Sequence, residues 1–424
     1  MKDILFEWNP WWSEAYCFKG IAREKLEGIL PWISRKEVIS ILGVRRAGKT
    51  TLLYEVISHL INIKKVNPKN IVFIKADDDR ADKDELIDKA LDEYYKWINP
   101  SYKIFAFVDE VQEINGWQKT IKRVYDLHPE VKLFISGSNA SLLKEDLGSF
   151  LAGRFAYFEI FPFSFSEFLL AKEVLIKEDN DLIKNKNKIR HLLMDYIAIG
   201  SFPEVILEDD YKIKKELIGF YFDSIFYRDV IKRKAIRNPA KLEKLVKYFL
   251  QNISSLANFT KIAKLLELTT DSVVEYTKAL EDAYLVFPIN LLEFSYKKQI
   301  INPKKIYCAD TGIRNIVGFK FSDDIGKLYE NIVFIHLKRN IKEIYYWKNN
   351  YECDFITKEG KNLSAIQVCY DIANAKEREL KGILEAMRQF KIKKGLIITE
   401  NYEAQENIEG KKINYVPLWK WLLE

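Results

Sequence analysis

The sequence contains few cysteines and no apolar run long enough to cross a lipid bilayer. The four cysteines, Cys17, Cys308, Cys353 and Cys369, are scattered and include no C-x-x-C pair, which argues against a disulfide framework and against a zinc site. The first residues lack the apolar core of a signal peptide. We therefore expect a cytoplasmic protein with no membrane partner.

A large excess of charge of either sign is also lacking, since the formal net charge is only +6. This mild excess permits binding to nucleic acid without requiring it. Apolar residues make up 48% of the chain and charged residues 30%, which excludes a disordered protein and is typical of a folded one with several cores. A chain of 424 residues has room for roughly two to four domains.

A short β-branched run, Val38–Leu42, precedes a turn bounded by two glycines and then a helical pattern. The turn reads G-x-x-x-x-G-K-T, and its position between a strand and a helix is the context that confirms a P-loop. The glycines let the backbone approach phosphate, and the N–H groups at the helix start face the anion. Lys49 would contact the β- and γ-phosphates, and the Thr50 hydroxyl would ligate Mg²⁺. The predicted nucleotide-binding residues of this loop are Gly43, Val44, Arg45, Arg46, Ala47, Gly48, Lys49, Thr50 and Thr51.

Strands and helices alternate from Val38 to Phe161, which predicts an α/β fold with helices on both faces of a parallel sheet. One apolar run, beginning at Ile104, ends in Asp109-Glu110 and matches a Walker B element. Asp109 would hold Mg²⁺ directly or through water. Glu110 would orient and polarise the attacking water. Ligands of such folds bind at the carboxyl ends of the strands, where both motifs fall.

Two further positions are candidates for phosphate chemistry. Ser138 or Asn139, which follow the strand Val131–Ser136, would lie beside the γ-phosphate and sense it, although these residue types also form plain turns. Arg154 is a candidate for the cation that neutralises charge in the transition state, in its own subunit or in a neighbouring one. The alternative for Arg154 is an ion-paired arginine on the surface.

The middle of the chain raises nucleic acid as a partner. The basic stretch 228–247 could lie along phosphates, or it could be a solvated helix face. Two short helices, Phe259–Leu266 and Asp271–Leu285, are separated by a tight turn and followed by the strand-like run Val286–Leu292, which predicts a winged helix. In such folds the second helix enters the major groove. Its exposed face would carry Asp271, Glu275, Lys278 and Glu281. Because this face is not basic, a purely structural winged helix is an equal alternative.

The C-terminal region carries a weaker, nuclease-like pattern. Glu330, Asp354 and Gln367 could converge on one metal site at the ends of strands. A nuclease of this kind needs acidic ligands for Mg²⁺ and a lysine that stabilises charge or activates water. Cys369 stands where that lysine is expected, and Lys348 on a neighbouring strand is the replacement that we consider. The pattern therefore predicts a domain that keeps its shape and has a degenerate site.

The motifs of the whole chain follow one another as GVRRAGKTTLL, FAFVDEVQ, FISGSNASLL, LAGRF, FPFSFSEF, GSFPEV, FYRDV, YYWKNNYECDF and AIQVCY. In this order they resemble the prokaryotic AAA-type ATPases with a C-terminal DUF4143 domain, which are close to an archaeal ATPase group. The resemblance covers nearly the whole chain. It implies an AAA+-like core, a lid and winged-helix region, and a restriction-endonuclease-like C-terminal fold. It also implies ATP and Mg²⁺ as cofactors, held by residues 43–51, Asp109 and Glu110.

These observations predict five segments: an N-terminal segment (1–36), a P-loop ATPase core (37–165), a helical lid (166–240), a winged helix (241–318) and a restriction-endonuclease-like domain (319–424). We expect an ATP-hydrolysing protein in which the nucleotide state is coupled to the binding of DNA or of a protein. The alternatives are an ATP-gated, metal-dependent nuclease and a nucleotide switch for a protein partner without turnover. Only the resemblance favours ATP over GTP.

Overall fold

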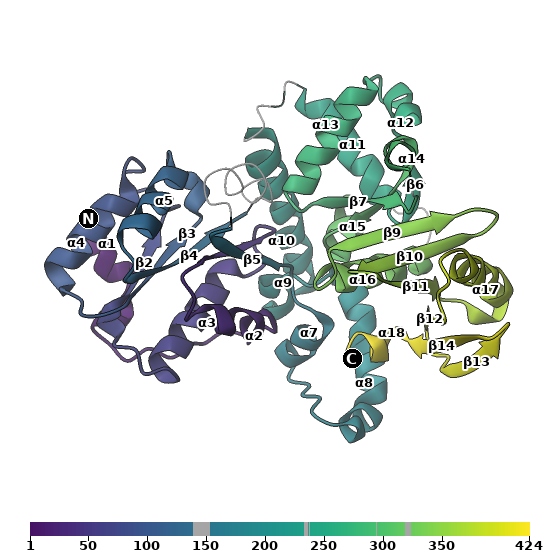
Figure 1. Ribbon diagram of the computed structural model, residues 1–424, viewed down its shortest axis with the longest axis horizontal. Coiled ribbons are helices and arrows are strands. Elements are labelled where there is room, and N and C mark those ends of the chain that lie inside the picture. Colours follow the sequence, from purple (N-terminus) through teal and green to yellow (C-terminus); the bar gives the residue numbers. More distant parts are fainter. Residues whose placement is uncertain (139–152, 233–235, 237, 294, 319–323) are drawn as a thin grey trace. The chain divides into compact units, whose positions relative to one another are not determined.

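A computed structural model describes residues 1–138, 153–232, 236, 238–293, 295–318 and 324–424 (Figure 1). These residues form two compact units, Met1–Phe161 and Pro162–Glu424. No helix within the described ranges is both long enough and apolar enough to span a membrane. The predicted segment boundaries inside the second unit stay predictions.

The first unit begins with an aromatic segment and continues with alternating strands and helices. Its elements are α1 (Lys2–Trp8), η1 (Pro10–Trp12), α2 (Lys25–Ile29), η2 (Leu30–Trp32), β1 (Val38–Gly43), α3 (Lys49–Asn62), η3 (Pro68–Asn70), β2 (Ile71–Lys75), α4 (Leu86–Ile98), β3 (Ile104–Asp109), η4 (Val111–Glu113), α5 (Trp117–Leu127), β4 (Val131–Gly137) and β5 (Phe155–Ile160).

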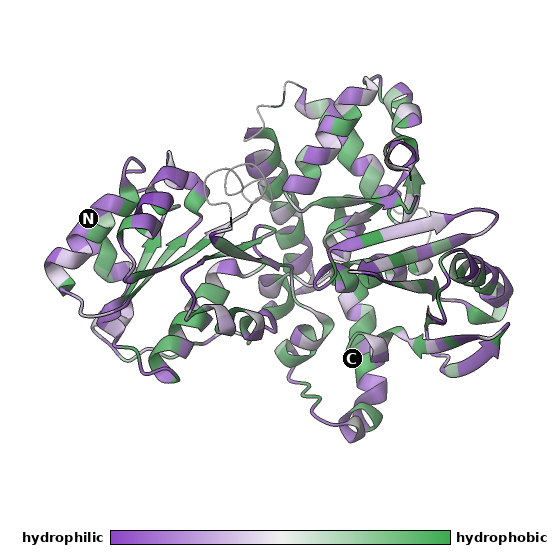
Figure 2. Ribbon diagram, viewed as in Figure 1, coloured by the Kyte–Doolittle hydropathy of each residue, from purple (hydrophilic) through white to green (hydrophobic). Residues whose placement is uncertain are grey.

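The five strands of this unit form a parallel sheet in the order β2-β3-β4-β1-β5. Helices α4 and α5 lie on one face of the sheet and α3 lies on the other (Figure 1). All residues of β1, β3 and β4 are buried, as expected for strands that are covered on both faces. Figure 2 shows the apolar residues concentrated in these strands. The predicted α/β fold with a parallel sheet is confirmed, and the carboxyl ends of β1, β4 and β3 meet at one edge.

The aromatic segment at the N-terminus covers the free edge of this sheet. Asn9 accepts a hydrogen bond from the Phe73 N–H and donates one to the Phe73 carbonyl at 2.9 Å, so it pairs with the edge strand β2. The indoles of Trp11 and Trp12 donate to the Ile71 carbonyl at 3.1 and 2.8 Å. An edge strand that is covered in this way does not recruit another strand.

The second unit is larger and mostly helical in its first half. Its elements are α7 (Phe165–Ala171), α8 (Asp179–Ile199), α9 (Pro203–Leu207), α10 (Tyr211–Ser224), the π-helix η6 (Ile225–Lys232), α11 (Pro239–Gln251), β6 (Ser255–Ala257), α12 (Phe259–Leu265), α13 (Thr270–Asp282), β7 (Val286–Leu291), α14 (Tyr296–Ile301), β8 (Lys304–Cys308), α15 (Thr311–Val317), α16 (Ile325–Lys338), β9 (Glu343–Lys348), β10 (Glu352–Glu359), β11 (Asn362–Cys369), α17 (Ile372–Gln389), β12 (Lys394–Thr399), β13 (Ala404–Ile408), β14 (Lys411–Pro417) and α18 (Leu418–Trp421).

A nine-stranded sheet organises the second unit, in the order β13-β14-β12-β11-β10-β9-β7-β8-β6. The strands β6, β8 and β7 pair antiparallel, and β7 then pairs parallel with β9 through Asn290↔Tyr345 and Leu291↔Tyr346. The sheet therefore continues across the boundary predicted at residue 318. This continuity brings β8 and β10 into one sheet, and α16 packs against β8 and β11.

Candidate functional site

The P-loop connects β1 to α3 and contains two residues in the left-handed region. Arg46 has φ +68° and Gly48, which precedes the first residue of α3, has φ +91°. Backbone turns that pass through such conformations form concave groups of N–H donors that bind anions. The loop therefore provides an anion cradle at the amino end of a helix, in the position that the sequence predicts.

Gly43 has a role that the motif alone does not reveal. It is the last residue of β1, has φ +152° and pairs with Ile160 of β5. A Cβ atom at Gly43 would lie 1.9 Å from the Ile160 carbonyl oxygen, which is far inside van der Waals contact. The first glycine of the P-loop is therefore required for the close approach of two strands.

Lys49 is buried at the mouth of the P-loop. Its ammonium donates to the carbonyls of Gly43 at 3.2 Å and Val44 at 3.3 Å, and lies 3.5 Å from Glu110 Oε1. The lysine side chain is only 3% exposed. A buried ammonium that faces the loop provides a strong point charge for a phosphate held by the cradle.

Asp109, at the carboxyl end of β3, meets the start of α3. The Thr50 hydroxyl donates to Asp109 Oδ2 at 2.8 Å, and the Ser136 hydroxyl on β4 donates to Oδ1. Burial raises the pKa of Asp109 to about 6, with a further contribution from the neighbouring carboxylate of Glu110. A hydroxyl and a carboxylate at this separation are the oxygen donors that suit Mg²⁺, so these residues fit the predicted ion.

Glu110 is held by residues on both sides. Its backbone has φ +51°, and its N–H donates to the Ser136 hydroxyl at 3.0 Å. The Gln112 amide donates to the Glu110 carboxylate and lies 3.4 Å from the Ser138 hydroxyl. Burial raises the pKa of Glu110, but Lys49 and Gln112 outweigh burial and the pKa is lowered. The carboxylate is therefore kept ionised next to the anion cradle.

The structure thus brings together Lys49, Thr50, Asp109, Glu110 and Ser138, all of which the sequence singled out. Asn139 lies outside the described residues. The remaining loop residues lie where the motif places them, with Val44 and Ala47 fully buried, Arg45 half-buried, Arg46 exposed and Thr51 in the first turn of α3.

Three residues of the site were missed by the sequence reasoning. Ser136 and Gln112 hold the two acids. Ser136 could have been found from the sequence, because it is a polar residue near the end of a buried strand. Arg23 of the N-terminal segment donates to the Ala47 carbonyl at 2.6 Å and to the Phe161 carbonyl at 2.8 Å. It fixes the P-loop from a position that no local motif indicates.

Arg154 does not belong to this site within its own chain. It precedes β5, and its carbonyl accepts the N–H of Val38, the first residue of β1. It therefore lies at the amino edge of the sheet, opposite the P-loop, and its guanidinium pairs with Asp126 at 2.8 Å. The prediction that Arg154 acts in the site of its own subunit is therefore wrong. The side chain instead matches the alternative prediction of an ion-paired arginine.

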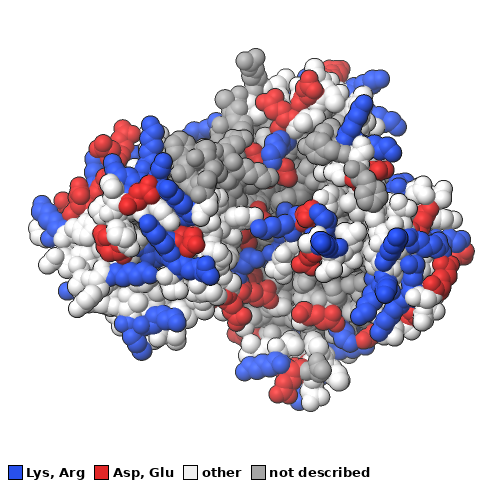
Figure 3. Space-filling view, in the orientation of Figure 1, with Lys and Arg blue, Asp and Glu red and all other residues white. Residues whose placement is uncertain are grey.

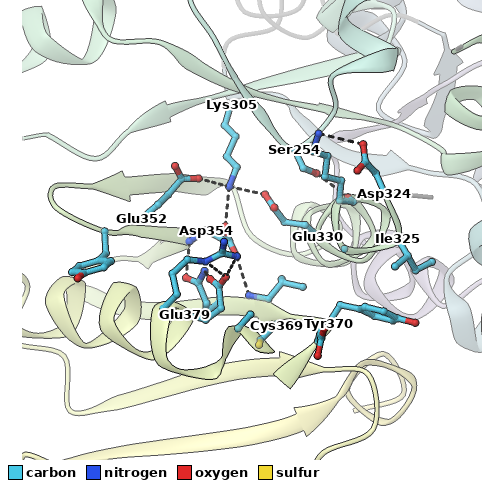
Figure 4. A pocket seen from close by; sticks show the side chains of 18 of the residues that line it. Ser254, Lys305, Asp324, Ile325, Glu330, Glu352, Asp354, Cys369, Tyr370 and Glu379 are labelled. Carbon is cyan, nitrogen blue, oxygen red and sulfur yellow. Dashed lines mark hydrogen bonds and ion pairs between the residues drawn. The ribbon is translucent and has the colours of Figure 1, made fainter. Parts of the chain in front are cut away.

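A second cluster lies in the second unit, around a buried lysine on β8 (Figure 4). The ammonium of Lys305 lies 2.7 Å from a carboxylate oxygen of Glu330, 2.8 Å from one of Glu352 and 2.8 Å from one of Asp354. The sequence predicted the convergence of Glu330 and Asp354, but it named neither Glu352 nor Lys305. Among the described residues, no group of three or more His, Cys, Asp or Glu side chains is arranged to hold a metal ion.

The other predicted members of the nuclease-like site have different roles. The side-chain oxygen of Gln367 accepts a hydrogen bond from the Asp354 N–H at 3.1 Å, and its amide donates to Glu379, so Gln367 supports both of these acidic residues. Cys369 is 2% exposed and packs with the apolar core, but it also lines the cavity that contains Asp354 and Glu379, and its thiol does not supply the cation expected at this position. Lys348, the cation that we considered, has a half-exposed side chain and contacts Glu352 at 3.3 Å.

The basic stretch 228–247 is only partly described. Of its cations, Lys247 pairs with Glu243 at 2.6 Å and Lys241 donates to a backbone carbonyl. Arg233, Lys234 and Arg237 lie outside the described residues. Over the face drawn in Figure 3, basic side chains are interspersed with acidic ones.

The exposed face of α13 matches the prediction in composition. Asp271, Glu275 and Lys278 are exposed on it. Lys278 pairs with Glu281 at 2.8 Å and with Asp282 at 3.0 Å, so its charge is offset within the helix. This face offers little attraction to phosphate.

The strand order, the P-loop and the Asp-Glu pair at the end of β3 define a nucleotide-binding protein of the AAA type. In agreement, the family model described as "AAA domain" matches residues 35–169. Two models described as domains of unknown function, DUF8612 and DUF4143, match residues 190–323 and 325–421.

Relatives that match over most of their length identify the family. An uncharacterised protein of Methanocaldococcus jannaschii is 35% identical over 404 residues, which cover 90% of this chain and 87% of the relative. An uncharacterised protein of Haemophilus influenzae is 28% identical, with 94% of this chain and 98% of the relative covered. The chain belongs to the family of prokaryotic AAA-type proteins with a C-terminal DUF4143 domain.

Similarity to solved structures is more distant. C. elegans PCH-2 matches with a TM-score of 0.30 and 17% identity over 42% of this chain and 54% of that chain. The S. cerevisiae Hsp104:casein complex matches with a TM-score of 0.31 and 11% identity over 65% of this chain and 52% of that chain. The chain therefore spans about half the length of each of these structures.

Proposed function

We propose that this chain hydrolyses ATP in a Mg²⁺-dependent reaction at the carboxyl edge of its parallel sheet. The observation that carries the proposal is the meeting of two pairs of side chains at this edge. Thr50 and Asp109 lie 2.8 Å apart, and Lys49 and Glu110 lie 3.5 Å apart. Each pair joins the P-loop segment to the end of β3, which is the arrangement that phosphoryl transfer to water requires.

Each of these residues has a separate role in the proposed reaction. The backbone N–H groups of the P-loop and the Lys49 ammonium bind the phosphates. Thr50 and Asp109 would hold Mg²⁺, which when bound neutralises charge on the β- and γ-phosphates. Glu110 orients a water molecule and accepts hydrogen bonds from it, and Gln112 keeps the Glu110 carboxylate in place.

The lowered pKa of Glu110 supports this assignment. A carboxylate must be ionised to orient and polarise water, and Lys49 and Gln112 hold it in that form. Burial of the site strengthens each of these interactions, because the water that would screen them is excluded.

The coupling of nucleotide state to a partner is a further part of the proposal. The order α11, β6, α12, α13, β7, β8, with three antiparallel strands, supports a winged-helix region. The acidic character of the α13 face and the pairing of Lys278 favour a protein partner over DNA. We therefore propose that this region binds a protein and that ATP binding changes its affinity for that protein.

ATP turnover by the full chain tests the enzymatic part. Glu110→Gln should lower kcat by about 10²–10⁴-fold while ATP binding persists, because the water is no longer oriented. Lys49→Ala should lose ATP binding. Glu113→Gln is the matched control, since Glu113 is exposed three residues further along the same turn. Equal turnover in the wild type and the Lys49 and Glu110 variants would remove the mechanism.

DNA as partner is tested in parallel by retention on duplex DNA at low and high salt. The electrostatic argument expects no retention at low salt. Retention that falls steeply with salt, and turnover that rises with DNA, would replace the protein partner by DNA.

A further inference from the structure

The carboxylate cluster around Lys305 has the geometry of a cation site that is filled by the chain itself. An ammonium group has three N–H donors, and the three carboxylates of Glu330, Glu352 and Asp354 lie 2.7–2.8 Å from it. The lysine side chain is 2% exposed. The three acids come from two elements, α16 and β10, so their convergence is a property of the tertiary fold.

We propose that Lys305 takes the position of a divalent cation in this cluster, and that removing its ammonium converts the cluster into a binding site for Mg²⁺ or Mn²⁺. The wild-type domain then holds its three acids together without a metal. Carboxylate oxygens are the ligands that these hard cations prefer.

The acids are anchored independently of the lysine, so they stay in place when it is changed. The second carboxylate oxygen of Asp354 accepts the Val368 N–H at 3.0 Å. Glu330 accepts the Tyr307 hydroxyl at 2.6 Å, and Glu352 contacts Lys348 at 3.3 Å. Supporting contacts of this kind orient the ligands of metal sites.

A metal ion has a path to the cluster. Lys305 and the three acids line a cavity of about 690 Å³, together with polar residues of α16, β11 and α17 (Figure 4). A cavity of this size admits a hydrated ion. The ligand types, their supporting contacts and a path for the ion are therefore present, and the Lys305 ammonium occupies the position that the metal would take.

The charge balance explains why the lysine and a metal exclude each other. The ammonium occupies the point where the oxygens of the three acids converge. Removing it leaves neighbouring acidic groups without a central cation, which destabilises the domain. A divalent cation restores that charge, so the variant should be stabilised by metal in a concentration-dependent way.

The experiment compares full-length wild type, Asp354→Asn, Lys305→Met, Lys305→Met with Asp354→Asn, and Lys304→Met. Methionine keeps the length and the apolar stem of lysine. Lys304 is the adjacent residue, and its ammonium donates to the Gln299 carbonyl instead of contacting the cluster. Mn²⁺ binding is measured by electron paramagnetic resonance without nucleotide, and thermal unfolding is followed with and without Mn²⁺.

We expect Lys305→Met to bind one more Mn²⁺ than the wild type and to show a higher unfolding temperature when Mn²⁺ is added. Both effects should vanish with Asp354→Asn and be absent in Lys304→Met. A folded Lys305→Met that gains no Mn²⁺ overturns the proposal. Wild-type Mn²⁺ binding that is lost on Asp354→Asn also overturns it, because the lysine then does not fill the site.

If Lys305→Met is unfolded in metal-free buffer, its refolding on addition of Mn²⁺ is measured instead. Recovery of the native unfolding transition supports the proposal, and failure to recover overturns it. None of these readouts depends on ATP turnover, so the result stands apart from the proposed ATPase activity.

Discussion

Gly43→Ala distinguishes two reasons for a glycine at the start of the P-loop. The sequence motif assigns this glycine to the approach of phosphate, whereas the structure shows it pressed against β5. If the approach of the strands is the stronger constraint, alanine should destabilise the first unit even in the absence of nucleotide.

The size of the effect follows from the distances. The new Cβ atom would lie 1.9 Å from the Ile160 oxygen and 2.8 Å from its carbonyl carbon, while real Cβ atoms essentially never approach closer than 3.0 Å. Strand β5 must therefore retreat by about 1 Å at the position where it pairs with β1, and both partners are backbone atoms that cannot rotate away. Together with the strain of φ +152°, we expect a loss of about 2–5 kcal/mol.

The assay is urea unfolding of the full chain without nucleotide, with Gly116→Ala as control. Gly116 also has a left-handed φ, +66°, but no atom lies within 4 Å of the position that its Cβ would take, so alanine there should cost only about 1 kcal/mol. Equal unfolding of Gly43→Ala and wild type, with a change only in ATP affinity, would refute the reasoning.

Two predictions concern buried groups of the second unit. Asp310→Ala should lower the free energy of unfolding in a urea titration by about 2–4 kcal/mol. The Asp310 carboxylate accepts hydrogen bonds from the Ser201 N–H at 2.7 Å and the Gly312 N–H at 2.9 Å, and both donors would be left unpaired. The control is Asp371→Ala, which removes an exposed helix cap and should cost about 1 kcal/mol in the same titration. Burial lowers the pKa of His336 from 6.5 to about 4, so this histidine takes up its proton at a higher pH in the unfolded chain than in the folded one. The free energy of unfolding should therefore fall as the pH decreases from 6.5 to about 4. Between pH 7 and pH 5 this loss should be on the order of 1–2 kcal/mol, and a His336→Leu variant that keeps the full pH dependence of thermal unfolding would contradict the assignment.

The sequence predicts the first unit well because its signals are local. The strands β1, β3 and β4 are buried on both faces and therefore appear as continuous apolar runs. The P-loop spans a few consecutive residues, so its spacing alone places Lys49 and Thr50 at a helix start. Asp109 and Glu110 follow from the rule that parallel strands present their carboxyl ends at one edge.

Long-range contacts account for what the sequence reasoning missed. Ser136 on β4 holds Asp109 at the end of β3, and Arg154 is separated from the P-loop by the full length of a strand. The cation at the C-terminal cluster was sought on β9 as Lys348, but the structure supplies it from β8. No periodicity or spacing connects these positions.

The sequence by itself determined the parallel α/β fold and predicted that Lys49, Thr50, Asp109 and Glu110 meet at its carboxyl edge, because both depend on patterns within single strands and turns. Only the tertiary structure decided that Gly43 packs against β5 and that Lys305 stands among three acids. Lys305 and Asp354 are 49 residues apart in the chain. Their meeting depends on the pairing of β8, β7, β9 and β10 in one sheet, which no local segment specifies.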